Sequence, residues 1–93
     1  MTDAELLVEC KIGLGIPVDQ TGFDGVLTQK LRAVKAYMSA AGVSEAMMTD
    51  DLAVGAVVLG VTDLWNIQGG GVQFSPVFVM AVSQLTISSL PTA

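Results

Sequence analysis

Hydrophobic residues recur at helical spacing through the middle of the chain. Between residues 23 and 41 they repeat every three or four positions, with polar residues on the opposite side. This spacing predicts an amphipathic helix that Asp24 would cap and that ends at about Ala41, with Gly42 at its C-terminus. The predicted apolar stripe comprises Phe23, Val26, Leu27, Leu31, Val34, Tyr37, Met38 and Ala41.

A shorter helix is predicted before this one. Thr2 and Glu5 have the spacing of a capping box, in which each side chain satisfies a backbone donor at a helix start. The helix would run from about residue 3 to 12, and a loop would follow over residues 17–22. Its apolar sector comprises Leu6, Leu7, Cys10 and Leu14.

The third predicted helix is apolar on nearly every side. After a predicted loop over residues 43–49, Asp50 and Asp51 stand where negative charge favours a helix start. The segment from Leu52 to about Ile67 then reads as a central, buried helix. Its β-branched content leaves a strand open as the alternative, although its length without a turn signal favours a helix.

The C-terminal third predicts a flexible link, a short helix and a tail. Residues 69–71 are three glycines, and Ser75 with Pro76 resembles an N-cap followed by proline at the first helical position. A fourth helix would end at about Leu85, and residues 86–93 would form a flexible tail. The predicted fold is therefore all-α, a small bundle of about four helices in one domain over residues 1–85.

The composition suggests that part of the apolar surface meets other chains. Of the 93 residues, 52% are hydrophobic and only 14% are charged, against roughly 25% charged in an average soluble domain. The longest apolar run, Leu52 to Val61, is ten residues long, and a spanning helix needs about 20. We therefore expect no membrane span. The acidic start of the chain also lacks the features of a signal peptide, which favours the cytoplasm.

The residue types argue against an enzyme, a cofactor or a metal site. The chain has no histidine and a single cysteine, Cys10, which excludes an internal disulfide, His-containing zinc sites and His-activated nucleophiles. A net charge of −5 with four basic residues opposes capture of nucleic acid. The three glycines lack a P-loop pattern. Asp50, Asp51 and Asp63 could form an acid/base pair or a metal cluster, but Asp50 and Asp51 are adjacent and are explained by helix-start charge.

Several segments together resemble the head–tail connector (adaptor) family of tailed bacteriophages. The first helix ends in Lys11-Ile12-Gly13-Leu14-Gly15-Ile16, and Phe23-Asp24 opens the amphipathic helix, which closes at Ala41-Gly42-Val43. A buried third helix and the segment from Phe74 to Leu85 complete the pattern. The likeness covers nearly the whole chain, but the triple glycine and a fourth helix without basic residues depart from it.

The resemblance implies a non-enzymatic structural role. Such a protein would form a homo-oligomeric ring, of about twelve copies in the family, beneath the phage portal protein. It would extend the DNA channel, receive the tail or a stopper protein, and let DNA pass without sequence-specific binding. It would be found in the neck of the virion and, during assembly, in the host cytoplasm.

Five residues are candidates for partner contacts. Lys30 projects from the apolar stripe, so either its stem lies on the core while its ammonium reaches water, or it meets a carboxylate of a neighbouring subunit. Trp65 and Phe74 belong either to the core or to an interface. Ile87 and Leu90 could fill a pocket on a neighbour when the tail orders.

One alternative function comes from the basic residues of the second predicted helix. Lys30, Arg32 and Lys35 lie close together in sequence and would suit a small helical regulator or nucleic-acid-binding protein. Two or three phosphate contacts would give only weak, salt-sensitive binding. The adaptor is therefore the leading hypothesis.

Overall fold

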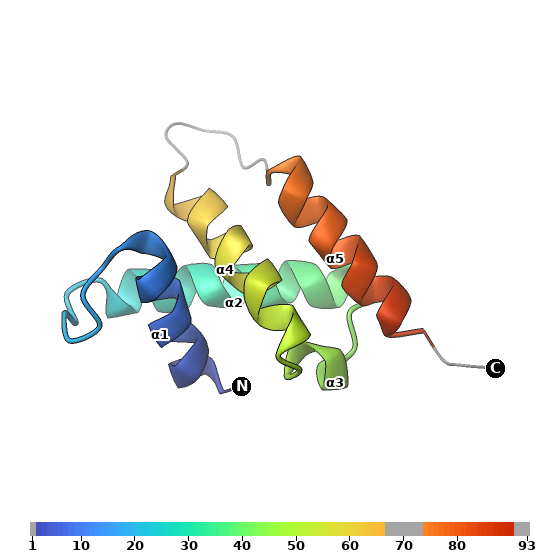
Figure 1. Ribbon diagram of the computed structural model, residues 1–93, viewed down its shortest axis with the longest axis horizontal. Helices are drawn as coiled ribbons and strands as arrows, with labels where there is room; N and C mark the ends of the chain where they lie inside the picture. The colour runs from blue at the N-terminus through green and yellow to red at the C-terminus, as the bar shows by residue number, and fades with distance from the viewer. Residues whose placement is uncertain (1, 67–73, 91–93) are drawn as a thin grey trace.

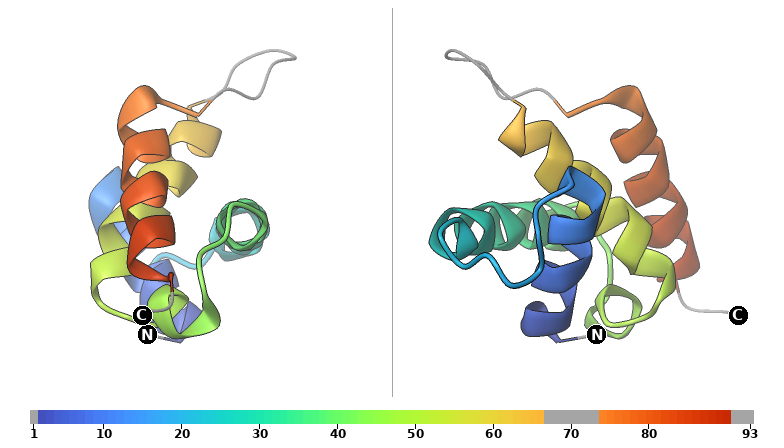
Figure 2. Two further views of the ribbon diagram at one scale, coloured as in Figure 1. Left: turned by 90° about the vertical axis from the view of Figure 1, so that its right-hand side faces the viewer. Right: turned by 60° about the vertical axis from the view of Figure 1, so that its left-hand side comes forward.

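The computed structural model describes residues 2–66 and 74–90, and this part of the chain is helical with no strand. Helices α1 (Asp3–Leu14), α4 (Leu52–Trp65) and α5 (Pro76–Ser88) form one layer. Helix α2 (Asp24–Ala40) crosses the face of that layer, and α3 (Glu45–Met48) is a single turn (Figures 1 and 2). The predicted all-α bundle is confirmed, and the strand alternative for the third predicted helix is excluded.

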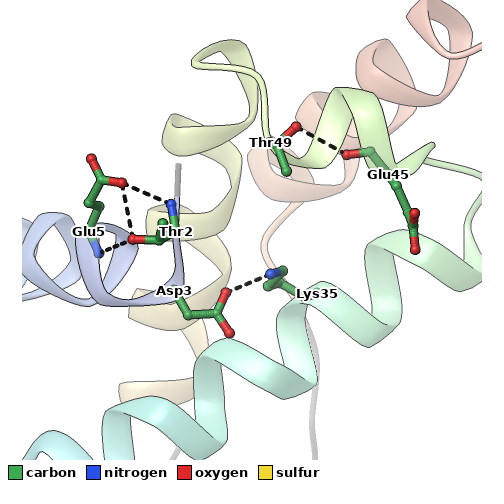
Figure 3. Close-up of polar contacts among 6 residues, drawn as sticks. All are labelled: Thr2, Asp3, Glu5, Lys35, Glu45 and Thr49. Atoms are coloured by element: carbon green, nitrogen blue, oxygen red, sulfur yellow. Dashed lines mark hydrogen bonds and ion pairs between the residues drawn. The ribbon is translucent and has the colours of Figure 1, made fainter.

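Helix α1 begins at the predicted capping box. The Thr2 hydroxyl accepts a hydrogen bond from the Glu5 backbone N–H at 3.2 Å, and the Glu5 carboxylate accepts one from the Thr2 N–H at 3.1 Å (Figure 3). These hydrogen bonds from Thr2 lower the pKa of the Glu5 carboxyl below its usual value. The helix ends at Gly15, whose φ of 73° places it in the left-handed region that favours glycine. It therefore runs two residues past its predicted end.

Helix α2 has the predicted extent, but not the predicted cap. Phe23 occupies the N-cap position and makes no side-chain capping bond, while Asp24 is the first helical residue. The prediction that Asp24 caps this helix is wrong because its carboxylate pairs with a lysine of α1 instead. At the other end Gly42 has a φ of 102° and turns the chain toward α3.

Helix α3 lies where a loop was predicted over residues 43–49. The Ser44 side chain accepts a hydrogen bond from the Met47 N–H at 3.2 Å and so caps one turn of helix. The next helix begins at Leu52, only four residues after α3 ends, and the Asp50 carboxylate accepts a hydrogen bond from the Leu52 N–H at 2.9 Å. Asp50 thus has the predicted helix-start role.

Helix α4 is the central element, but one of its faces is open. Its buried residues pack against α1, α2 and α5, yet Leu52 is 71% exposed and Gly55 is also exposed. The prediction of a central, buried helix is confirmed, except on the face that carries these two residues. None of the helices in the described ranges is long and apolar enough to cross a membrane. The predicted glycine link at 69–71 lies outside the described residues.

The core is assembled from four of the five helices and the turn after α2. Only part of the predicted α2 stripe contributes, since Val26 is 47% exposed and Phe23 and Tyr37 lie at the core's edge, about two-fifths exposed. Gly60 lets Phe78 of α5 and Val34 of α2 pack directly on the backbone of α4. A Cβ at this position would lie 2.6 Å from the Phe78 ring and 2.8 Å from Val34. The buried apolar residues are Leu6, Cys10, Leu27, Leu31, Val34, Met38, Val43, Ala53, Ala56, Val57, Val61, Phe78, Val82 and Leu85.

Helix α5 begins as predicted and extends further. Ser75 caps it by accepting from the Phe78 N–H, and Pro76 is its first residue. The predicted end at Leu85 is three residues too early, because residues 86–88 are helical. The single proton of the Thr86 hydroxyl has two acceptors within reach, the Val82 carbonyl one turn earlier at 3.0 Å and the Ala41 carbonyl at the end of α2 at 3.1 Å. Residues 91–93 of the predicted tail lie outside the described part, and mobility of the tail stays a prediction.

Candidate functional site

A line of exposed side chains runs along the outer side of α5. Val77, Met80 and Ile87 are 60%, 68% and 61% exposed, and Gln84 is also exposed. Their spacing of three, four and three residues places them on one side of the helix. We call these four residues the α5 stripe. Phe78, Val82 and Leu85 occupy the opposite side of α5 and are buried in the core.

The α5 stripe belongs to a part of the chain without charge. The net charge is −5, yet no Asp, Glu, Lys or Arg follows Asp63 in the sequence. Asp63 itself is engaged, because its carboxylate accepts hydrogen bonds from the Ser75 N–H and hydroxyl at 2.9 and 2.8 Å. Depletion of charge at the centre of a surface patch is a feature of protein–protein interfaces.

A groove between α4 and α5 adjoins the stripe. Its volume is about 410 Å³, and Gln84 belongs both to its lining and to the stripe. The two helices run antiparallel side by side (Figure 2), and the groove lies between the first part of α4 and the last part of α5. The α5 stripe and this groove together form what we call the docking face. The groove is lined by Leu52, Gly55, Ala56, Leu59, Ala81, Gln84, Leu85 and Ser88.

The five predicted contact residues are not brought together in one site. Ile87 lies on the α5 stripe, and Leu90, 62% exposed, follows the end of the same helix. Trp65 is half-buried, with its ring edge-on to Phe23 at a centroid distance of 5.3 Å. Phe74 packs on the Phe78 ring at 4.4 Å. The two aromatic residues therefore border the core, which is the first of the two roles considered for them.

Lys30 contacts its own chain. Its ammonium donates to the carbonyl of Leu64 at 3.4 Å, near the C-terminal end of α4, and its side chain is half-buried. A cation at this end of a helix is favourable because the last carbonyls lack partners within the helix. The structure thus agrees with the first interpretation of Lys30, in which its aliphatic stem lies along the protein. The Lys30 ammonium has a partner in its own chain and does not require a carboxylate on a neighbouring subunit.

Lys11 is a buried charge that is not among the predicted site residues. It is 3% exposed, and its ammonium donates to the carbonyls of Val18 and Gln20 at 3.2 and 2.8 Å. The same ammonium lies 2.6 Å from the Asp24 carboxylate. These contacts join α1, the following loop and the start of α2. We call them the Lys11 clasp.

Cys10 and the carboxylates offer little chemistry of their own. Burial, with a smaller contribution from Glu9, raises the pKa of the Cys10 thiol to about 11, so the neutral and poorly nucleophilic thiol prevails near neutral pH. Within residues 2–66 and 74–90, no three His, Cys, Asp or Glu residues gather closely enough to hold a metal ion. A second groove, beside α3, is bordered by Lys35, which forms an ion pair with Asp3 (Figure 3).

A scan against protein-family models, a search of curated proteins and a search of solved structures found no match to this chain. The docking face is therefore interpreted from its own residues.

Proposed function

We propose that this protein is a non-enzymatic structural adaptor that joins other protein chains through its docking face. The observation that carries the proposal is the α5 stripe, which holds three exposed apolar side chains on a helix without any charge. Burying such a surface removes apolar area from water and requires no carboxylate or ammonium to lose its hydration. The adjoining groove gives a partner's side chains a place to enter.

The proposed setting is the junction of head and tail in a tailed bacteriophage. The resemblance of the sequence to head–tail connectors supports this setting, as does the confirmed all-helical fold. In this role several copies, about twelve in the family, would form a ring beneath the portal and extend the DNA channel toward the tail or stopper protein. Such a ring repeats one modest contact many times, so its attachment is far stronger than that of a single copy.

The test is co-assembly with a portal ring, followed by negative-stain imaging and a pull-down. We expect the wild-type chain to bind the portal and Met80→Glu to weaken that binding by tenfold or more, because a carboxylate would have to be buried without a partner. Met80 is 68% exposed, so the variant should fold normally. Ala33→Glu, at an exposed position on α2, adds the same charge elsewhere and is the matched control. Absence of binding to any portal tested would refute the phage setting.

The alternative function, a regulator or nucleic-acid-binding protein, receives less support from the basic side chains. Lys11 is buried, Lys30 bonds to α4, and Lys35 is paired with Asp3. Arg32 is exposed on α2 and forms no ion pair or side-chain hydrogen bond with the described residues. One free cation gives little attraction to a phosphate backbone. Tight, sequence-dependent retardation in a gel-shift assay at low salt would reverse this preference.

A further inference from the structure

We propose that the free protein pairs with a second copy of itself, with the two α5 stripes packed antiparallel about a two-fold axis. This inference rests on the proposed function, because it names an occupant for the same docking face. It follows from the order of side chains along the stripe, from the distribution of charge, and from the size of the face.

The order of side chains in the α5 stripe is self-complementary. In an antiparallel pair of identical helices, two facing residues have numbers with a constant sum. The residue numbers of Val77 and Ile87 add up to 164, and so do those of Met80 and Gln84. Every stripe residue of one copy therefore faces a stripe residue of the second copy. The spacing of three, four and three residues is that of a coiled-coil seam. A parallel pair would instead bury the two Gln84 amides against each other.

The antiparallel arrangement suits the one polar residue in the stripe. Gln84 of one copy would lie against Met80 of the other, and the flexible thioether chain of methionine can adapt to its neighbour. Gln84 also borders the α4–α5 groove, so its amide can turn toward the rim and keep contact with water. Each Gln84 would therefore keep its hydrogen bonds while its stem packs in the seam.

Charge favours this face for contact between identical chains. Each copy carries a net charge of −5, so most orientations would bring carboxylates of two copies together. Every charged residue lies at or before Asp63, and α5 has none. When two copies meet through α5, no ionised side chain lies in either stripe, so the contact brings no like charges together there.

The size of the face predicts a weak dimer. A stable specific interface takes about 800 Å² from each partner, which is about one seventh of the 5620 Å² surface of this chain. The α5 stripe spans about three helical turns, so we expect it to bury less than that area even with the groove beside it. We expect dissociation in the range of tens to hundreds of micromolar.

A two-fold pair closes on itself and cannot build a ring by repetition. The pair is therefore a form of the free protein, in which each copy covers the docking face of the other. A partner that binds the docking face would have to displace the second copy. Pairing and attachment to the partner would then compete for the α5 stripe.

Sedimentation velocity over about 5 to 500 µM tests the pairing. The average mass should rise with concentration from 9.6 kDa toward twice that value. Met80→Glu should weaken the dimer at least tenfold, while Ala33→Glu should leave it unchanged. Gln84→Leu should strengthen it about tenfold, because a polar seam residue is replaced by an apolar one. A wild-type protein that stays monomeric over the whole range would overturn the proposal.

Disulfide trapping tests the orientation. In the antiparallel pair, a Met80→Cys copy mixed with a Gln84→Cys copy should form a crosslinked dimer under mild oxidation, since the two positions face each other. Each variant alone should crosslink poorly, and buried Cys10 should not compete. Efficient crosslinking of Gln84→Cys alone would show parallel pairing and would overturn the antiparallel arrangement.

The two proposals can fail separately. A monomeric protein whose portal binding is still weakened by Met80→Glu would refute the pairing and support the adaptor. A dimer that Met80→Glu disrupts, in a protein that binds no portal, would support the pairing and refute the phage setting.

Discussion

Replacing Lys11 by methionine removes the charge of the Lys11 clasp while keeping most of the side-chain volume. The ammonium lies 2.6 Å from the Asp24 carboxylate and also donates to the carbonyls of Val18 and Gln20. The Lys11→Met variant therefore leaves one carboxylate and two carbonyls without their donor. The apolar stem and its packing on the core remain.

The expected cost follows from how deeply each partner is buried. Removing one member of a buried ion pair costs about 3–5 kcal/mol. The Lys11 side chain is 4% exposed and that of Asp24 is 34% exposed, so water can hydrate part of the carboxyl group, although the Oδ1 atom that faces the ammonium is buried. We therefore expect a loss of about 2–3 kcal/mol. A domain of this size has roughly 5–14 kcal/mol of stability in total, so the loss should be large in relation to it.

The assay is urea unfolding followed by circular dichroism, with Lys35→Met as the matched control. Lys35 pairs with Asp3 at the same distance of 2.6 Å, but the two side chains are 30% and 53% exposed. Such an exposed pair contributes about 0–1 kcal/mol. If the two variants differ by less than about 0.5 kcal/mol, burial does not strengthen the Lys11 clasp and the reasoning fails. The thermal midpoint of Lys11→Met should fall by about 10–20 °C.

Three further predictions concern the core. Gly60→Ala should destabilise the fold by about 1–3 kcal/mol in urea unfolding, because the new Cβ would lie 2.6 Å from Phe78. Gly55 has open space around it, so Gly55→Ala should be neutral or slightly stabilising. Val34→Asp should abolish the cooperative melt, since it buries an unpaired charge in α2 at a cost of about 3 kcal/mol or more. The pKa of Cys10 is raised to about 11 in the folded protein, so as the pH rises the thiol ionises in the unfolded chain before it ionises in the folded one. The free energy of unfolding should therefore fall between about pH 9 and 11, and it should fall less in Cys10→Ala than in the wild type. An equal fall in both proteins would contradict this.

The helices were predictable where the sequence carries both a periodic pattern and a start signal. Thr2 with Glu5 and Ser75 with Pro76 each start a helix that the structure confirms. The turn of α3 was missed because a helix of four residues is too short to show periodicity, although Ser44 could have indicated its start. The extension of α5 was missed because its last turn lies against the end of α2, where Thr86 contacts Ala41, and residues so far apart in sequence give no local signal.

The Lys11 clasp was harder to predict because it depends on the path of a loop. Lys11 lies four residues after Leu7 and three before Leu14, on the apolar side of α1, and this position was the available signal. The sequence alone does not reveal that the next loop turns two carbonyls toward it. The sequence predicts that Asp24 is a cap because a carboxylate at a helix start usually has that role. The structure shows that pairing with a buried cation takes precedence.

The two sides of α5 require different explanations, and this difference carries the functional argument. Phe78 and Val82 are apolar because they fill the core. Folding gives no such reason for Met80 or Ile87, which remain more than 60% exposed, and polar residues would serve the fold equally well there. A single exposed apolar residue needs no explanation, but three share one side of an uncharged helix, interrupted there by Gln84, which also lines the neighbouring groove. The charged residues of the chain, including the Lys11 clasp, stabilise or solvate α1 to α4. They leave the exposed side of α5 without charge, which the proposed contact with another protein chain requires.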